Sequence, residues 1–94
     1  MKASQVHTDL QRNLGLRIRF LREQQGLSQY VFSDMISMNR SYLISVEKGR
    51  RNISLSNLFK ISSGLGITLS DMLTDVDGFV YEQVQLPEAP NDAV

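Results

Sequence analysis

The chain has 94 residues, of which 41% are apolar, so it is long enough for one compact domain and too short for two. It has no cysteine and a single histidine, which excludes disulfides and thiolate sites and argues against a histidine-based metal site or a Ser-His hydrolase. No apolar run approaches the ~18 residues of a membrane helix, and the polar N-terminus lacks a signal-peptide core. We therefore expect a cytoplasmic protein without a metal, a cofactor or a membrane partner.

The net charge of zero conceals two halves of opposite sign. Residues 1–73 hold all ten basic side chains against five acidic ones, a net charge of +5, whereas residues 74–94 hold five acids and no base, a net charge of −5. Such an asymmetry indicates a basic body that meets a polyanion, followed by an acidic tail. Ordinary solvated surfaces would give the same pattern, so charge alone does not decide between them.

A first amphipathic helix is predicted by apolar residues at spacings of four, four and three: Leu10, Leu14, Ile18 and Leu21. We expect it to begin at Leu10, after an N-terminal arm of residues 1–9, and to be capped by Gly26. No proline precedes Pro87, which favours a helical body.

Two short helices are predicted next, one over 29–36 capped by Ser28 and one over 40–47 capped by Asn39. Three residues, 37–39, form the turn between them. The inward positions of the pair are Phe32, Ser33, Ile36, Met38, Leu43 and Val46. This arrangement is typical of a helix-turn-helix.

A fourth helix over 55–63, capped by Ser54, is predicted by the core face Leu55, Leu58, Ile61 and Leu65, and we expect Gly64 and Gly66 to end it. Thr68 and Asp71 match a capping box that opens a short fifth helix, to residue 73. The helical period then stops, and residues 79–84 read as a short β-strand.

Burial of the inward positions turns the opposite face of the 40–47 helix outward. That face carries Arg40, Ser41, Ile44 and Ser45. A helix that presents Arg and Ser on its outer first turns can enter the major groove of DNA and reach base edges.

Five short stretches, in this order and spacing, resemble the Cro/C1-type helix-turn-helix regulators of the XRE family: IRFLR at 18–22, GLSQ at 26–29, SYL at 41–43, VEKGRRN at 46–52 and LGI at 65–67. The resemblance implies an all-α, five-helix, lambda-repressor-like domain over residues 10–74. It also implies a homodimer that binds a pseudo-palindromic operator in double-stranded DNA, on the nucleoid. The function implied is sequence-specific transcriptional regulation, as a repressor or as the controller of a small genetic module.

The resemblance also implies roles for single residues. Base-reading positions are Asn39, Arg40, Ser41 and Ser45, with Ile44 able to meet a thymine methyl. Phosphate-binding positions are Gln29, Tyr42, Lys48, Arg50, Arg51 and Asn52. Arg40 is the strongest candidate for reading a base, because a bidentate contact between arginine and guanine is the commonest specific pairing. The alternative is that Arg40 binds phosphate. For Arg50 and Arg51 the alternative is a solvated loop.

Arg22 and Glu47 match an internal ion pair of the family, which we expect to orient the recognition helix without touching bases. The chain departs from the family at Ser37, where the turn usually has a left-handed glycine, a conformation that costs another residue about 1–2 kcal/mol. Tyr30, Val31 and Ile44 also replace residues that are usually polar, and Ile53 replaces a proline.

The acidic tail, residues 75–94, lies outside the resemblance. Its apolar side chains Phe79, Val80, Tyr81 and Val84 are candidates for pairing with their mates across a dimer axis, for folding onto their own subunit, or for remaining disordered. Another possibility is that the acidic tail mimics phosphate and competes with DNA for the basic face. The alternative function is an antitoxin-type or adaptor protein that binds another protein, with the tail as candidate surface. No nucleophile–base pair, metal-ligand spacing or P-loop indicates an enzyme.

Overall fold

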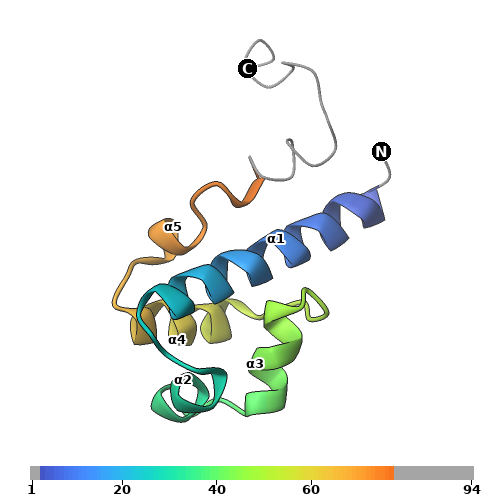
Figure 1. The fold of residues 1–94 in the computed structure, drawn as a ribbon. Helices are drawn as coiled ribbons and strands as arrows, with labels where there is room; N and C mark the ends of the chain where they lie inside the picture. The colour runs from blue at the N-terminus through green and yellow to red at the C-terminus, as the bar shows by residue number, and fades with distance from the viewer. Residues whose placement is uncertain (1–2, 78–94) are drawn as a thin grey trace.

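In a computed structural model, the residues described, 3–77, form five helices and no strand (Figure 1). The helices are α1 (Ala3–Gln24), α2 (Gln29–Met35), α3 (Arg40–Glu47), α4 (Leu55–Leu65) and α5 (Leu69–Met72). The predicted all-α, five-helix class is confirmed, whereas the strand predicted at 79–84 lies outside the described residues. None of these five helices combines the length and apolar character that crossing a membrane requires.

The long helix α1 runs across the domain, with α5 on one side of it and α2, α3 and α4 on the other in the view of Figure 1. It begins at Ala3 and not at Leu10, so residues 3–9 continue the helix where an arm was predicted. Asp9 is buried in this first part and pairs with Arg12 one turn later, at 3.1 Å. Such an i,i+3 ion pair stabilises this turn of the helix. The spacing of apolar residues, from which the helix was predicted, gave no sign of it.

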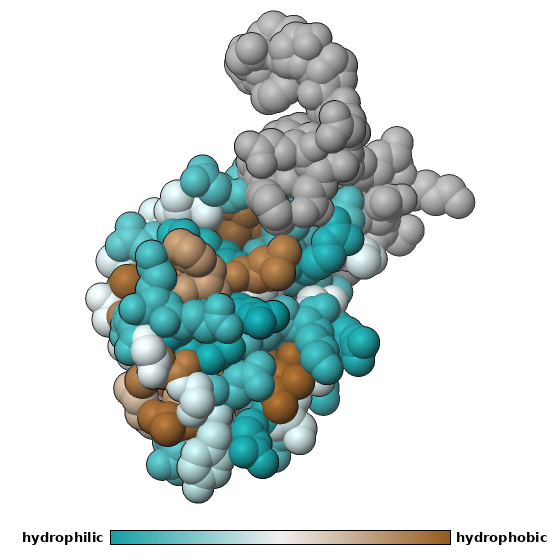
Figure 2. Space-filling model, in the orientation of Figure 1, coloured by the Kyte–Doolittle hydropathy of each residue, from teal (hydrophilic) through white to brown (hydrophobic). Residues whose placement is uncertain are grey.

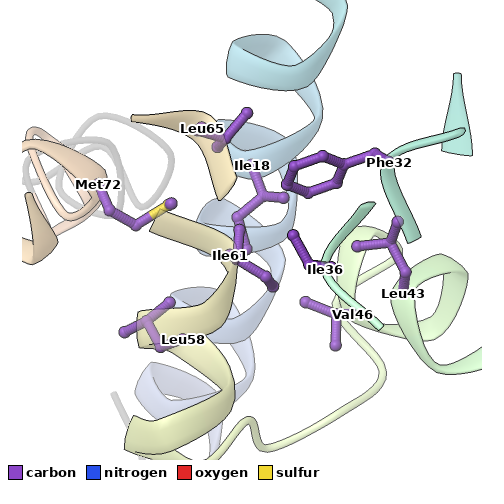
Figure 3. Packing of buried hydrophobic residues seen from close by; sticks show 9 residues of the cluster. All are labelled: Ile18, Phe32, Ile36, Leu43, Val46, Leu58, Ile61, Leu65 and Met72. Atoms are coloured by element: carbon purple, nitrogen blue, oxygen red, sulfur yellow. The ribbon is translucent and has the colours of Figure 1, made fainter. Parts of the chain in front are cut away.

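The hydrophobic core gathers buried side chains from all five helices (Figure 3). Its members are Ile18, Phe32, Ile36, Leu43, Val46, Leu58, Ile61, Leu65 and Met72. The inward positions predicted for the two short helices are therefore confirmed, with Ser33 buried beside them and Met38 packed against the cluster from the turn.

Four helices begin at the predicted N-caps. Ser28 and Ser54 each accept a hydrogen bond through Oγ, from the backbone N–H of residues 31 and 57 at 3.0 and 3.1 Å. Asn39 caps α3 through Oδ1, and Thr68 caps α5 through Oγ1, both at 3.0 Å. A cap of this kind contributes about 1 kcal/mol, which matters for helices as short as α2, α3 and α5.

Two details of the predicted fourth helix were wrong. Leu55 is 71% exposed and does not belong to the core face. Helical side chains lean toward the N-terminus, so a residue in the first turn points past the end of the packed surface. The helix also continues through Gly64 to Leu65. A Cβ at position 64 would overlap Ile36, so glycine is needed there for close packing of α4 and does not end the helix.

The turn between α2 and α3 keeps the left-handed conformation of the family although Ser37 replaces the usual glycine. Its φ is +54°, and the N–H of Met38 closes the turn by donating to the carbonyl of Ser33 at 2.8 Å. The serine therefore stores strain in the turn, which costs a non-glycine residue about 1–2 kcal/mol.

Replacing Ser37 by glycine should relieve that strain. The greater freedom of glycine in the unfolded chain offsets part of the gain, so we expect the free energy of unfolding to rise by about 0.5–1 kcal/mol. Urea denaturation of Ser37→Gly and wild type measures the difference. A variant of equal or lower stability would show that this turn is not strained.

The helices α1 and α3 approach each other backbone to backbone at Gly15. A Cβ at this position would lie 2.5 Å from the carbonyl oxygens of Val46 and Glu47, closer than real contacts allow. Gly49, just after α3, lies equally close to α1, because a Cβ there would come within 2.6 Å of the Cα of Arg12. The C-terminal end of α3 is thus held against α1 at two points.

Candidate nucleic-acid interface

The helix α3 has one buried and one outward side, as predicted. Leu43, Val46 and Glu47 are buried, whereas Arg40 and Ser41 are exposed. Ile44 and Ser45 are half-buried, and Asn39 is exposed at the cap. The structure therefore buries none of the five candidate base-reading residues.

Asn39 has a second task that limits what it can offer a base. Its Oδ1 accepts the N–H of Tyr42 as the cap of α3, at 3.0 Å. The second lone pair of Oδ1 and the amide NH2 remain for an outside partner. The capping bond fixes the orientation of the amide and so limits the directions from which a base or phosphate can reach it.

A buried ion pair fixes the end of α3 to α1. Arg22 donates to both carboxylate oxygens of Glu47, from Nε to Oε2 at 2.6 Å and from Nη2 to Oε1 at 2.9 Å. Its third nitrogen, Nη1, donates to the carbonyl of Leu27 at 2.6 Å. Both residues are 5% exposed, so the pair is buried and ties the end of α3 to α1.

The electrostatics of this pair favour the charged guanidinium. The hydrogen bond with Glu47 raises the pKa of Arg22 above its ordinary value, and the charges of Glu47 and Glu23 act in the same direction. Burial acts against them, because it penalises the charged form.

Gln29 joins this network from α2. Its Nε2 donates to Oε1 of Glu47 at 2.9 Å, so a residue predicted to bind phosphate is also tied to the end of α3. The side chain is half-buried. Gln29 therefore links α2 to the buried ion pair at the end of α3.

Four of the other five candidate phosphate-binding residues lie in the segment after α3, whereas the fifth, Tyr42, is half-buried within α3. Lys48, Arg50, Arg51 and Asn52 are all exposed. Gly49 takes a φ of +74°, and the turn closes with bonds from Gly49 N to Val46 O at 3.0 Å and from Arg50 N to Ser45 O at 2.9 Å. This helix end therefore fixes the direction in which the basic residues leave α3.

Positive charge dominates this part of the sequence. Between residues 35 and 54 there are four bases, Arg40, Lys48, Arg50 and Arg51, and all are exposed. Glu47 is the one acid in that stretch, and it is buried and neutralised by Arg22. A surface of this kind attracts a polyanion and repels other cationic surfaces.

Two arginine guanidinium groups lie over tyrosine rings in cation–π contacts. The guanidinium carbon of Arg51 lies 5.0 Å from the ring centroid of Tyr42, and that of Arg40 lies 5.2 Å from the ring centroid of Tyr30. The Tyr42 hydroxyl also accepts a hydrogen bond from Nδ2 of Asn57 at 3.1 Å. Sequence reasoning placed Tyr42 in the site but missed Asn57 and noted Tyr30 only as a departure from the family.

Apolar side chains remain exposed between the hydrophilic ones that cover much of the surface (Figure 2). On α1 these are Leu16 and Phe20, which line a groove of about 320 Å³ together with Val76. On α4 they are Leu55 and Phe59. Exposed apolar side chains such as these can form part of a partner surface.

Comparison with known proteins agrees with the geometry. The Helix-turn-helix family matches residues 18–72. Control protein C.MunI of Mycoplasma sp is 46% identical over 70 residues, which are 73% of this chain and 95% of that protein. The immunity repressor protein of Bacillus phage phi105 is 32% identical over 77% of this chain and 50% of its own length.

Solved structures give the same result. The crystal structure of the restriction-modification controller protein C.AhdI from Aeromonas hydrophila superimposes with a TM-score of 0.65 and 39% identity, over 68% of this chain and 96% of that one. The family match covers the segment that holds α2, α3 and the ion pair. The chain belongs to the Cro/C1-type helix-turn-helix family.

Proposed function

We propose that the protein is a sequence-specific DNA-binding transcriptional regulator, acting as a repressor or as the controller of a small genetic module. The observation that carries this proposal is the outward face of α3, which presents Arg40 and Ser41 while Leu43 and Val46 are buried. The similarity to control proteins and to an immunity repressor supports it.

Recognition follows from how α3 is held. The ion pair between Arg22 and Glu47, and the close approach at Gly15, fix the helix against α1 before DNA arrives. Its N-terminal turn can therefore enter the major groove with little reorganisation, which keeps the entropic cost of binding low. In this pose Arg40 donates to the O6 and N7 acceptors of a guanine.

Affinity comes mainly from phosphate neutralisation by the segment after α3 and by Gln29. We expect roughly 4–6 phosphate contacts per subunit, so the binding constant should fall steeply as salt concentration rises. The exposed bases Lys48, Arg50 and Arg51 supply the charge for this term.

The regulator acts as a homodimer on two half-sites one helical turn, about 34 Å, apart. The exposed apolar residues on α1 and α4 support a partner surface. Phe79, Val80, Tyr81 and Val84 lie outside the described residues, and their part in the dimer stays a prediction. Deleting residues 77–94 should weaken dimerisation in sedimentation equilibrium, and an unchanged dimerisation constant would remove the tail from the interface.

Arg40 and Arg50 should affect binding in different ways, because one is expected to read a base and the other to hold the backbone. Arg40→Ala should lose about 1–3 kcal/mol of discrimination at one base pair in each half-site. Arg50→Ala should weaken binding to all sequences alike and lower the salt slope by about one. Binding titrations on cognate and altered duplexes over a salt series separate the two patterns.

Selection of bound sites from a random pool of duplexes tests the proposed function as a whole. We expect a two-fold symmetric site with a guanine at a fixed place in each half. The adaptor alternative predicts loss of the outward basic set, whereas Arg40, Arg50 and Arg51 are all exposed. A pool that shows no enrichment would contradict the proposed function.

A further inference from the structure

The contact between Tyr30 and Arg40 joins the two helices of the helix-turn-helix on their outer side. Tyr30 is the second residue of α2, and its side chain is 65% exposed. Arg40 is the first residue of α3 and is exposed as well. The guanidinium carbon lies over the tyrosine ring, 5.2 Å from its centroid. Neither residue is part of the core, so packing of the interior does not explain the contact.

We propose that Tyr30 is a positioning residue that determines specificity, because its ring holds the Arg40 guanidinium in the orientation that reads a guanine. This inference rests on the proposed function and adds a residue to it. Tyr30 itself need not touch DNA in order to act in this way.

The geometry of a stacked guanidinium suits this role. The five N–H donors of arginine point outward in the plane of the group, whereas an aromatic ring occupies one of its faces. A ring beneath Arg40 therefore leaves the edge of the fork available for the two acceptors of a guanine. An acidic side chain at position 30 would instead take up the same donors that the base requires.

The surroundings of Arg40 leave this contact as its main restraint. Within residues 3–77 no ion pair involves Arg40. A long exposed arginine without a restraint samples many rotamers, and binding has to select one of them. Stacking at an exposed site favours the stacked rotamers by roughly two- to fivefold. The expected gain in discrimination is of the same size.

A second stack in the same protein provides a contrast. Arg51 lies over the ring of Tyr42, whose hydroxyl is held by Asn57. Arg51 is expected to bind phosphate, which is present at every sequence. Disturbing that stack should weaken binding to all duplexes, whereas disturbing the Tyr30 stack should change the preference between duplexes.

The test compares Tyr30→Leu with Tyr30→Phe by fluorescence titration on two duplexes. One is the selected site, and the other has the guanine expected to face Arg40 replaced in both half-sites. Leucine keeps apolar bulk but has no ring, and phenylalanine keeps the ring but has no hydroxyl. Val31→Ala, at the exposed neighbouring position, is the control for a change in α2 that leaves the stack intact.

We expect Tyr30→Leu to lower the ratio of the two dissociation constants by roughly two- to fivefold, and Tyr30→Phe and Val31→Ala to leave it unchanged. In an Arg40→Ala background, Tyr30→Leu should no longer alter the ratio, since the two residues act as a unit. Thermal melts establish that each variant is folded.

Each other outcome overturns a defined part of the account. If wild type shows no preference between duplexes, the proposed function fails. If wild type discriminates and Tyr30→Leu discriminates equally well, the positioning role of Tyr30 fails alone. If Tyr30→Phe lowers the ratio as far as Tyr30→Leu does, the hydroxyl and not the ring restrains Arg40, and the stacking role is wrong.

Discussion

Glu47→Ala should lower the free energy of unfolding by about 3–5 kcal/mol, because it leaves a buried guanidinium without its partner. Arg22 is 5% exposed and donates two hydrogen bonds to this carboxylate, and Gln29 donates a third. The loss is a large fraction of the stability of a small domain. Urea denaturation followed by circular dichroism measures it, and a loss below about 1 kcal/mol would contradict the assigned role.

A double variant separates the cost of an orphaned charge from the value of the pair. Replacing both partners by apolar residues, Arg22→Met with Glu47→Leu, should recover most of the stability, because a buried ion pair contributes little beyond an apolar pair of similar volume. Recovery of DNA affinity should be less complete, since Gln29 loses its acceptor on α3. The pKa of Arg22 is raised in the folded protein. The ion pair therefore contributes fully to the free energy of unfolding at pH values below the pKa of Arg22 in the unfolded chain. This contribution is lost only when the pH rises through the pKa of Arg22 in the folded protein.

Gly15→Val should cost about 3 kcal/mol, at the upper end of the usual range for overpacking. The Cβ would meet two backbone carbonyl oxygens, of Val46 and Glu47, and neither can rotate away as a side chain would. The helices α1 and α3 would have to separate, which would also disturb the nearby ion pair. We therefore expect DNA binding to weaken together with stability.

Leu16→Val is the matched control for this variant. This variant places valine at the next position of α1, where the native leucine is 42% exposed. The change in its free energy of unfolding therefore measures the effect of the low helix propensity of valine without the clash. A loss in Gly15→Val no larger than that in the control would show that the two helices can separate without cost.

Local signals in the sequence were enough to predict most of the fold. The caps Ser28, Asn39 and Ser54 mark helix starts, because each side chain accepts a hydrogen bond from the backbone N–H three residues later. The start of α1 was missed because its first two turns carry no apolar period and depend on a pair such as Asp9 with Arg12. Leu55 was misplaced because spacing along a helix does not show where the packing surface ends.

The candidate site was predictable in its positions but not in its restraints. An outward Arg40 follows from the burial of Leu43 and Val46 on the other side of α3. The close approach at Gly15 depends on how α1 and α3 cross, although a glycine within a helical pattern was a usable warning. The stack of Arg40 on Tyr30 depends on the angle between α2 and α3, which no local pattern encodes.

Methylation interference on the selected duplex tests most directly whether α3 reads the major groove through Arg40. Dimethyl sulfate modifies the N7 of guanine, which is one of the two acceptors expected for this arginine. We predict one guanine per half-site whose methylation blocks wild-type binding, and we predict that Arg40→Ala becomes indifferent to that methyl group while other interference persists. An interference pattern that is identical for the two proteins, or that contains no guanine N7, would contradict the account.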